Sequence, residues 1–242
     1  MIHMSSESKN EKFLIVAFPS VGLVGSFAIS YLSAQLQMKD IGELEISEIS
    51  PSYVIEKGEA YGPIRIYNKD NIYAILAGIP INIQTTFELI KKSIDFAKRN
   101  NISKIIIPRG LEVDKNFKGD PVSYGLAVNK NSKSALDEIN LPSVPGATVF
   151  GADASVISAL KNSDATAIIL YTTCRMMMPD DDAIIKSIKT LSDIIRVKID
   201  TEKFEERLEK INRENQKIIE ETRKYYENSS GRSTVTPTPG IG

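Results

Sequence analysis

The sequence of 242 residues predicts an α/β fold, a three-layer sandwich around a mixed, mainly parallel sheet, with a long C-terminal helix. Three apolar runs, 13–17, 104–107 and 165–171, are typical of strands covered on both faces, because a half-exposed strand would need alternating polar positions. Amphipathic segments separate these runs along the chain. The alternation of buried strands with helices predicts one α/β domain over residues 12–200.

Three further segments are expected around this domain. Residues 1–11 are polar and predict a flexible leader without the apolar core of a secretion signal. A charged helix follows the domain over 201–227, and residues 228–242 have the Ser, Thr, Pro and Gly composition of a disordered tail.

The first strand leads through a glycine-containing turn into a helix, and this turn has two interpretations. Backbone N–H groups ahead of a helix can bind an anion. However, the turn lacks both a GxGxxG pattern and a Walker lysine. Gly22 and Gly25 are therefore interpreted mainly as structural glycines that let the helix pack closely on the strand.

Antiparallel elements are expected beside the parallel core. Residues 44–49 alternate apolar with acidic side chains, which predicts a half-exposed strand. Residues 68–71 have the composition of a hairpin turn that leads into a strand over 72–77.

Local signals also predict where two later elements begin and end. Thr85 and Glu88 are spaced as a capping box at the start of a helix. Residues 108–110, Pro-Arg-Gly, predict a turn out of the strand 104–107. The run 180–182 of three aspartates is interpreted as the first turn of a helix, favoured by the helix dipole, with a metal site as the alternative.

Composition gives few signs of catalysis or of charged partners. The net charge of −1 gives no reason to expect a nucleic acid or an acidic membrane as partner. His3, the one histidine, lies in the leader, so a His-based triad or zinc site lacks its usual residue. Cys174, the one cysteine, is interpreted as a small core residue in preference to a nucleophile. A single cysteine also fits a reducing, cytoplasmic setting. We predict no catalytic residue, cofactor or metal site.

The helix over 201–227 carries a heptad seam. Its seam positions follow the spacing 4, 3, 4, 3, 4, 3: Phe204, Leu208, Ile211, Asn215, Ile218, Thr222 and Tyr225. Such a seam predicts self-association, with Asn215 as a polar residue that fixes register and copy number. The alternative is an amphipathic helix that lies on its own domain.

Three motifs together resemble the proteasome assembly chaperone family, in particular archaeal homologues of the second eukaryotic chaperone. They are PSVGLVGSFAISYL at 19–32, PGATVFGADASVISAL at 145–160, and a long block at 172–211 that begins TTCRMMMPDDD. The resemblance implies a phosphorylase/hydrolase-like fold without a catalytic role. It also implies a homo-oligomer, a trimer or larger, that binds proteasome α subunits or the 20S core.

The same resemblance implies that a C-terminal tail contacts the α-ring. In characterised relatives the tail commonly ends in a hydrophobic residue, a tyrosine and one more residue. This sequence ends in Pro239, Gly240, Ile241 and Gly242, which lack that tyrosine. We assign these four residues to a partner-binding tail.

Two other classes of function stay open. The first is a hydrolase or phosphorylase acting on a small anionic substrate, with Arg109 and Arg175 holding the anion and Glu112 as the nearby acid. Arginines at strand ends more often form structural ion pairs, and a fold does not settle function. The second is a purely structural oligomerisation protein with an unrelated partner.

Overall fold

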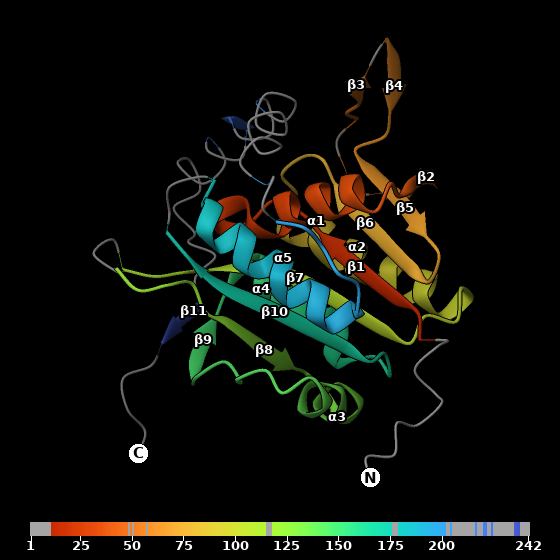
Figure 1. Cartoon of the computed structure of the whole chain (residues 1–242). Helices are drawn as coiled ribbons and strands as arrows, with labels where there is room; N and C mark the ends of the chain where they lie inside the picture. Colours follow the sequence, from red (N-terminus) through yellow and green to blue (C-terminus); the bar gives the residue numbers. More distant parts are fainter. Residues whose placement is uncertain are drawn as a thin grey trace.

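The structure is a computed structural model, shown in Figure 1. It describes residues 11–201 apart from 48, 50, 57, 115–117 and 176–178, together with 204, 216, 220, 221, 224 and 235–237.

A seven-stranded sheet with the strand order β2-β5-β6-β1-β7-β10-β8 forms the centre of the domain. Its strands are β1 (Phe13–Ala17), β2 (Lys39–Glu43), β5 (Ile64–Lys69), β6 (Ile72–Ala77), β7 (Lys104–Glu112), β8 (Ser123–Ala127) and β10 (Ala167–Cys174). The neighbours β6, β1, β7 and β10 run parallel, while β5, β2 and β8 join them antiparallel. The predicted mixed, mainly parallel sheet is confirmed.

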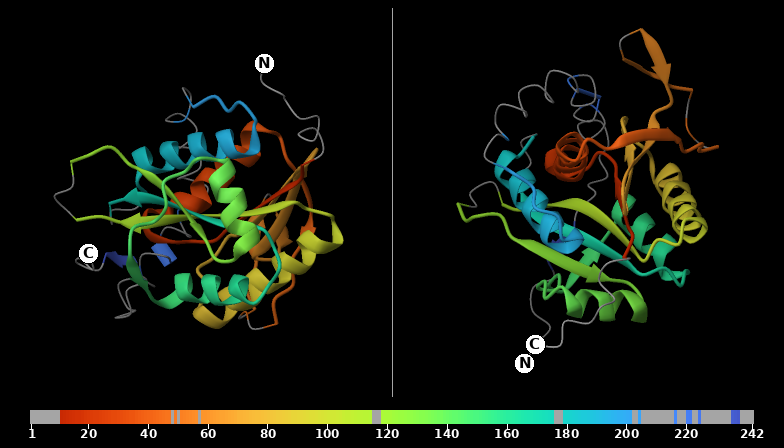
Figure 2. Two further views of the ribbon diagram at one scale, coloured as in Figure 1. Left: turned by 90° about the horizontal axis from the view of Figure 1, so that it is seen from below. Right: turned by 45° about the vertical axis from the view of Figure 1, so that its right-hand side comes forward.

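Helices cover both faces of this sheet, as the three-layer prediction requires. They are α1 (Val24–Gln35), α2 (Ile83–Arg99), α3 (Lys130–Glu138), α4 (Gly151–Lys161) and α5 (Asp181–Ile195), and a short 3-10 turn η2 (Val21–Leu23) precedes α1. Helices α1 and α5 share one apolar cluster with the sheet, whereas α2 and α4 share the other. The left-hand view in Figure 2 shows α5 above the sheet and α2 and α4 below it.

Two small sheets lie outside the central one. Strands β3 (Val54–Glu56) and β4 (Glu59–Tyr61) form a hairpin, and β9 (Ala147–Val149) pairs with β11 (Val235–Pro237). The β3–β4 hairpin stands away from the rest of the domain in Figure 1.

The strand expected over 44–49 is wrong, because the preceding segment β2 forms the edge strand. Arg65 on β5 forms an ion pair with Asp40 on β2, which places residues 39–43 along β5. Residues 44–47 then cross towards α2, where the backbone N–H of Ser47 donates to Glu88 (3.0 Å). The apolar and acidic residues alternate here because Ile46 is buried in the core while Glu45 is exposed. Residues 44–47 do not belong to a strand.

The turn expected at 108–110 is also wrong, since β7 continues to Glu112. Pro108 lies opposite Leu170 of β10, in the middle of the parallel pairing. Pairing of β7 with β1 ends at Ile106, so beyond that residue β7 has only one hydrogen-bonded neighbour among the strands. A strand tolerates the missing N–H of proline at such a position.

The start of α2 lies three residues before the predicted capping box. Asn82 is the N-cap residue, and its side chain accepts a hydrogen bond from the backbone N–H of Thr85 (2.8 Å). Glu88 instead accepts from Ser47, so the capping box is a wrong prediction. The run 180–182 does begin a helix, because the Asp180 side chain accepts from the N–H of Ala183 at the start of α5.

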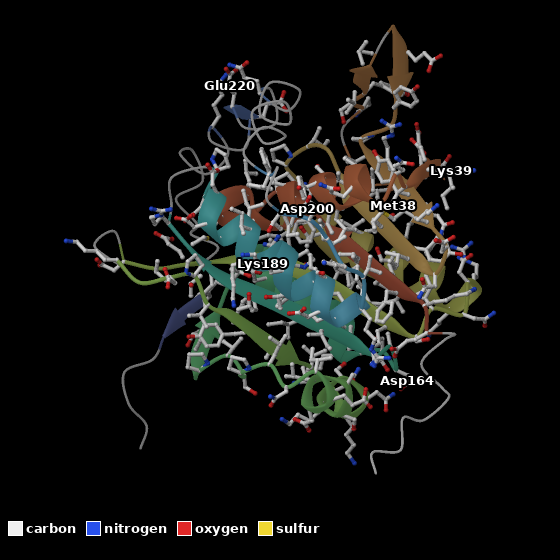
Figure 3. All side chains as sticks on the ribbon, viewed as in Figure 1. Met38, Lys39, Asp164, Lys189, Asp200 and Glu220 are labelled. Atoms are coloured by element: carbon white, nitrogen blue, oxygen red, sulfur yellow. The ribbon has the colours of Figure 1, made fainter. Side chains whose placement is uncertain are left out.

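The C-terminal segment begins by packing on its own domain. Phe204, predicted as the first seam residue, is buried, and its ring meets that of Tyr31 on α1 at a centroid distance of 5.0 Å. The Tyr31 hydroxyl donates a hydrogen bond to the carbonyl oxygen of Asp200 (2.6 Å), a residue labelled in Figure 3. The first seam residue is therefore buried against its own domain, as in the alternative interpretation of the helix.

The rest of the C-terminal predictions fall mainly outside the described residues. These include the seam residues Leu208, Ile211, Asn215, Ile218, Thr222 and Tyr225, and the tail residues 239–242. Among the described positions, Gln216, Glu220, Glu221 and Lys224 are helical and exposed. Val235–Pro237 form strand β11, which differs at these three residues from the disorder expected over 228–242.

Replacing Asn82 tests the observed start of α2. We expect Asn82→Ala to lower the free energy of unfolding by about 1 kcal/mol, because the N–H of Thr85 loses its acceptor. Asn82→Ser, which keeps an oxygen acceptor, should stay within about 0.5 kcal/mol of the parent chain. Urea unfolding followed by circular dichroism measures both, and equal losses for the two variants would contradict the assigned cap.

Candidate functional site

The carboxyl ends of the parallel strands meet at one edge of the sheet, which is where ligand sites of open α/β sheets usually lie. The turn after β1 is pressed closely onto β7 at this edge. A Cβ atom on Gly25 would lie 2.3 Å from the Pro108 carbonyl oxygen, and one on Gly110 would lie 2.0 Å from the Val21 carbonyl oxygen. Only glycine fits these two positions without backbone movement.

Gly22 in the same turn has a positive φ of 65°, and a Cβ atom there would lie 2.9 Å from the sulfur of Cys174. The contacts of Gly22 and Gly25 agree with the structural interpretation of both residues. The turn is used for packing against β7 and β10, and its backbone approaches other protein atoms closely.

A buried ion pair lies beside this turn. The Arg109 Nε on β7 donates to Asp153 Oδ1 on α4 at 2.9 Å, and the second guanidinium nitrogen lies 3.3 Å from Oδ2. The two side chains are only 2% and 6% exposed. Arg109 thus forms a structural ion pair, and it does not present its charge to a ligand, contrary to the role considered for it in an enzyme.

Two aromatic side chains complete this buried cluster. The Tyr171 hydroxyl on β10 donates to Asp153 Oδ1 (3.1 Å), and the Arg109 guanidinium carbon lies 4.2 Å from the ring centroid of Phe18. Burial, reinforced by the charge of Asp153, raises the pKa of Tyr171 well above its usual value. The tyrosine therefore stays a neutral hydrogen-bond donor at physiological pH. The cluster connects the residue after β1 with β7, β10 and α4.

A second set of charged groups lies at the end of β10. The half-exposed Arg175 donates to Asp180 (3.0 Å) and to Asp182 (2.9 Å). Burial alone would raise the pKa of Asp180, but hydrogen bonds from Arg175 and from the N–H of Ala183 lower it below its usual value. Arg175 is therefore committed to holding the start of α5.

A shallow pocket of about 160 Å³ opens beside these residues. Its lining includes Val113, Lys118, Asp120, Thr173 and Arg175, but not Arg109. The two arginines of the enzyme hypothesis are therefore not brought together around one anion site. Across the described part of the chain, no group of three acidic, histidine or cysteine side chains is placed to hold a metal ion.

Cys174 is among the residues that line this pocket, but it is only 2% exposed and packs in a small apolar cluster with Val21, Val24 and Ala183. Burial, together with the nearby carboxylates of Asp180 and Glu112, raises the pKa of its thiol to about 12. A neutral, buried thiol is a poor nucleophile. The interpretation of Cys174 as a core residue is confirmed. None of the described helices is both long and apolar enough to cross a lipid bilayer.

Sequence reasoning identified Arg109 but missed its partner. Asp153 lies 44 residues away from Arg109, within the motif GADAS, where it reads as an ordinary acidic residue in the first turn of a helix. The signal available in the sequence was the position of Arg109 close after the apolar run 105–107, since a buried charge needs a partner.

The comparisons with known proteins identify the family. The PAC2 family profile matches residues 14–219, and the chain belongs to the PAC2 family. An uncharacterised protein of Methanocaldococcus jannaschii is 39% identical over 90 residues, a match that spans 36% of this chain and 37% of that relative.

Solved structures of archaeal proteins share the fold. Pyrococcus furiosus PbaA, described as an archaeal homolog of proteasome-assembly chaperone, has a TM-score of 0.77 and 22% identity, covering 90% of this chain and 95% of its own. A Thermoplasma acidophilum protein of unknown function has a TM-score of 0.75 and 19% identity, covering 93% and 92%. Pyrococcus furiosus PbaB, described as an archaeal proteasome activator, has a TM-score of 0.64 and 19% identity, covering 86% of this chain and 93% of its own.

Removing the carboxylate of the buried pair should be costly. We expect Asp153→Ala to lower the free energy of unfolding by about 3–5 kcal/mol, because the Arg109 charge loses its closest buried partner. The double variant Arg109→Met/Asp153→Leu should recover most of this loss. Asp137→Ala, which breaks an exposed pair with Lys133, serves as the control and should cost less than about 1 kcal/mol. Urea unfolding tests the set, and equal costs for Asp153→Ala and Asp137→Ala would contradict the assignment.

The lowered pKa of Asp180 predicts a pH dependence of stability. Its folded-state pKa lies below the usual value of 3.8, so the charged carboxylate stabilises the fold at neutral pH, and this contribution disappears as the pH falls through the folded-state pKa. Asp180→Asn keeps an N-cap oxygen but removes the charge. We expect the stability difference between the parent chain and Asp180→Asn to be constant above about pH 5 and to shrink in more acidic buffer. Unfolding titrations between neutral and acidic pH measure this difference, and one that does not change with pH would contradict the assignment.

Proposed function

We propose that this protein is a non-enzymatic proteasome assembly chaperone or adaptor that binds proteasome α subunits or the α-ring as a homo-oligomer in the cytoplasm. The observation that carries the proposal is membership of the PAC2 family over 206 of the 242 residues, counted from 14 to 219. The shared fold with PbaA, described as a proteasome-assembly chaperone homolog, supports it.

The geometry of the sheet edge supports a binding role over a catalytic one. Arg109 is paired with Asp153 in the interior, and Arg175 is paired with the acidic start of α5. Cys174 is buried with a raised pKa. The two arginines and the cysteine considered for an enzyme are thus committed to packing and capping.

The mechanism that we infer is the holding of several subunits at once. An oligomer that carries one binding surface per copy raises the effective concentration of the α subunits bound to it, which favours their assembly into a ring. We assign the contacts to the C-terminal region, with the seam residues from Leu208 to Tyr225 joining copies and the tail residues 239–242 reaching the partner.

Binding to α subunits tests this function directly. We expect the full chain to retain purified archaeal proteasome α subunits or α-rings on an affinity resin, and truncation after Asn228 to weaken the binding at least tenfold. A variant with residues 229–242 in shuffled order is the matched control for tail length and composition. If neither the full chain nor the truncated chain binds α subunits or α-rings, the proposed function is wrong.

A further inference from the structure

Strand β9 has an edge that the C-terminal segment covers. Val235–Pro237 (β11) lie antiparallel along Ala147–Val149 (β9), and Figure 1 shows the two strands side by side. Among the described residues, the strand pairing joins β9 to no other strand. An open strand edge is a template for an added strand. The tail therefore occupies an edge of the domain that can accept a strand.

The domain holds this edge in place. Ala147 and Val149 are partly buried and pack against the apolar core cluster of α2 and α4, while Thr148 between them is exposed. Strand β9 leads directly into α4, where Asp153 forms the buried pair with Arg109. These contacts position β9 without help from the tail, so the edge exists before β11 docks on it.

The register of the pairing suits the proline of β11. Thr236 lies opposite Thr148, and Pro237 lies opposite Ala147. In an antiparallel pair of strands, residues that exchange both N–H···O bonds alternate with residues that exchange neither. Proline has no N–H, so Pro237 belongs to a pair without these bonds, and Thr236 and Thr148 form the hydrogen-bonded pair. A two-stranded contact of this length is only marginally stable, so it can open and close.

Docking shortens the reach of the tail. The five residues 238–242 follow β11, and an extended chain spans about 3.5 Å per residue, so Gly242 stays within about 18 Å of Pro237. The last described residue before β11 is Lys224. Without the docked strand, the 18 residues beyond Lys224 can extend up to about 60 Å. Docking therefore keeps the C-terminus close to β9.

We propose that β9 is a docking site for the chain's own tail, and that the docked tail is held back from the partner. In this closed state β11 lies on β9, and residues 239–242 engage a proteasome subunit only after β11 has left. Because only the released fraction binds, docking weakens the apparent affinity for the partner by the factor by which it lowers that fraction. The proposal rests on the partner-binding role of residues 239–242 in the proposed function and adds the closed state to it.

An engineered disulfide that holds the closed state tests the proposal in the full chain. Val235 lies opposite Val149, one position from the hydrogen-bonded pair, where Cα atoms are about 4.5 Å apart and a disulfide can form. In Val149→Cys/Val235→Cys, oxidised glutathione should link the tail to β9 within one chain, as measured by mobility on a non-reducing gel. We expect the oxidised variant to bind α subunits at least about tenfold more weakly than the same variant after reduction.

Two controls accompany this variant. Ala147→Cys/Val235→Cys is out of register by two residues, which places the Cα atoms about 7–8 Å apart, so its disulfide should form more slowly. The parent chain, whose Cys174 is buried, should bind α subunits equally before and after oxidation. A disulfide that forms no faster than in the out-of-register control, a link between two chains, or unchanged binding by the oxidised variant would overturn the proposal.

A variant that releases the tail should have the opposite effect. Thr236→Pro removes the N–H of the hydrogen-bonded pair, whereas Thr236→Val keeps it. We expect Thr236→Pro to bind α subunits more tightly than the parent chain, and Thr236→Val to bind as the parent chain does. Equal binding by the two variants would contradict the closed state. If the parent chain and the reduced double variant both fail to bind α subunits, the proposed function is wrong and the role of the closed state falls with it, although the disulfide still reports whether the tail docks.

Discussion

The buried ion pair between Arg109 and Asp153 determines what the carboxyl edge of the sheet can do. Two opposite charges that are buried away from water stabilise each other, because neither is hydrated. The pair draws α4 onto β7, and the Tyr171 hydroxyl adds a hydrogen bond from β10. An edge that serves ligands in many α/β proteins is here stabilised by contacts among its own residues.

The glycines at this edge also favour contacts within the chain over contacts with a ligand. Gly25 and Gly110 bring the turn after β1 against the backbone of β7, and Gly22 lies against the sulfur of Cys174. Such close approach leaves little room for a ligand between the turn and the sheet. The pocket lined by Thr173 and Arg175 lies further out, beside the start of α5. Large apolar side chains of the described residues are exposed elsewhere on the domain, including Ile55 on β3 and Phe87 on α2.

Elements with a strong apolar pattern were predictable, and elements without one were not. The continuous apolar runs of β1, β7 and β10 identified the core strands, since only strands covered on both faces need such runs. Strand β2 is exposed at every position, so its residues 39–43 gave no apolar signal, and the alternation at 44–49 misled the prediction. The Arg109–Asp153 pair depends on the fold, because 44 residues separate its partners. A heptad pattern likewise does not distinguish a seam between copies from a helix docked on its own domain, and Phe204 illustrates the second case.

The position of Phe204 also affects how copies would assemble. Its contact with Tyr31 and the hydrogen bond from Tyr31 to the Asp200 carbonyl hold Asp200 and Phe204 against α1. A segment anchored at its base cannot by itself set the orientation of neighbouring domains unless a second contact does so. In the assembly that we propose, weak contacts between several copies reinforce each other through effective concentration, so each single junction can stay weak enough to exchange.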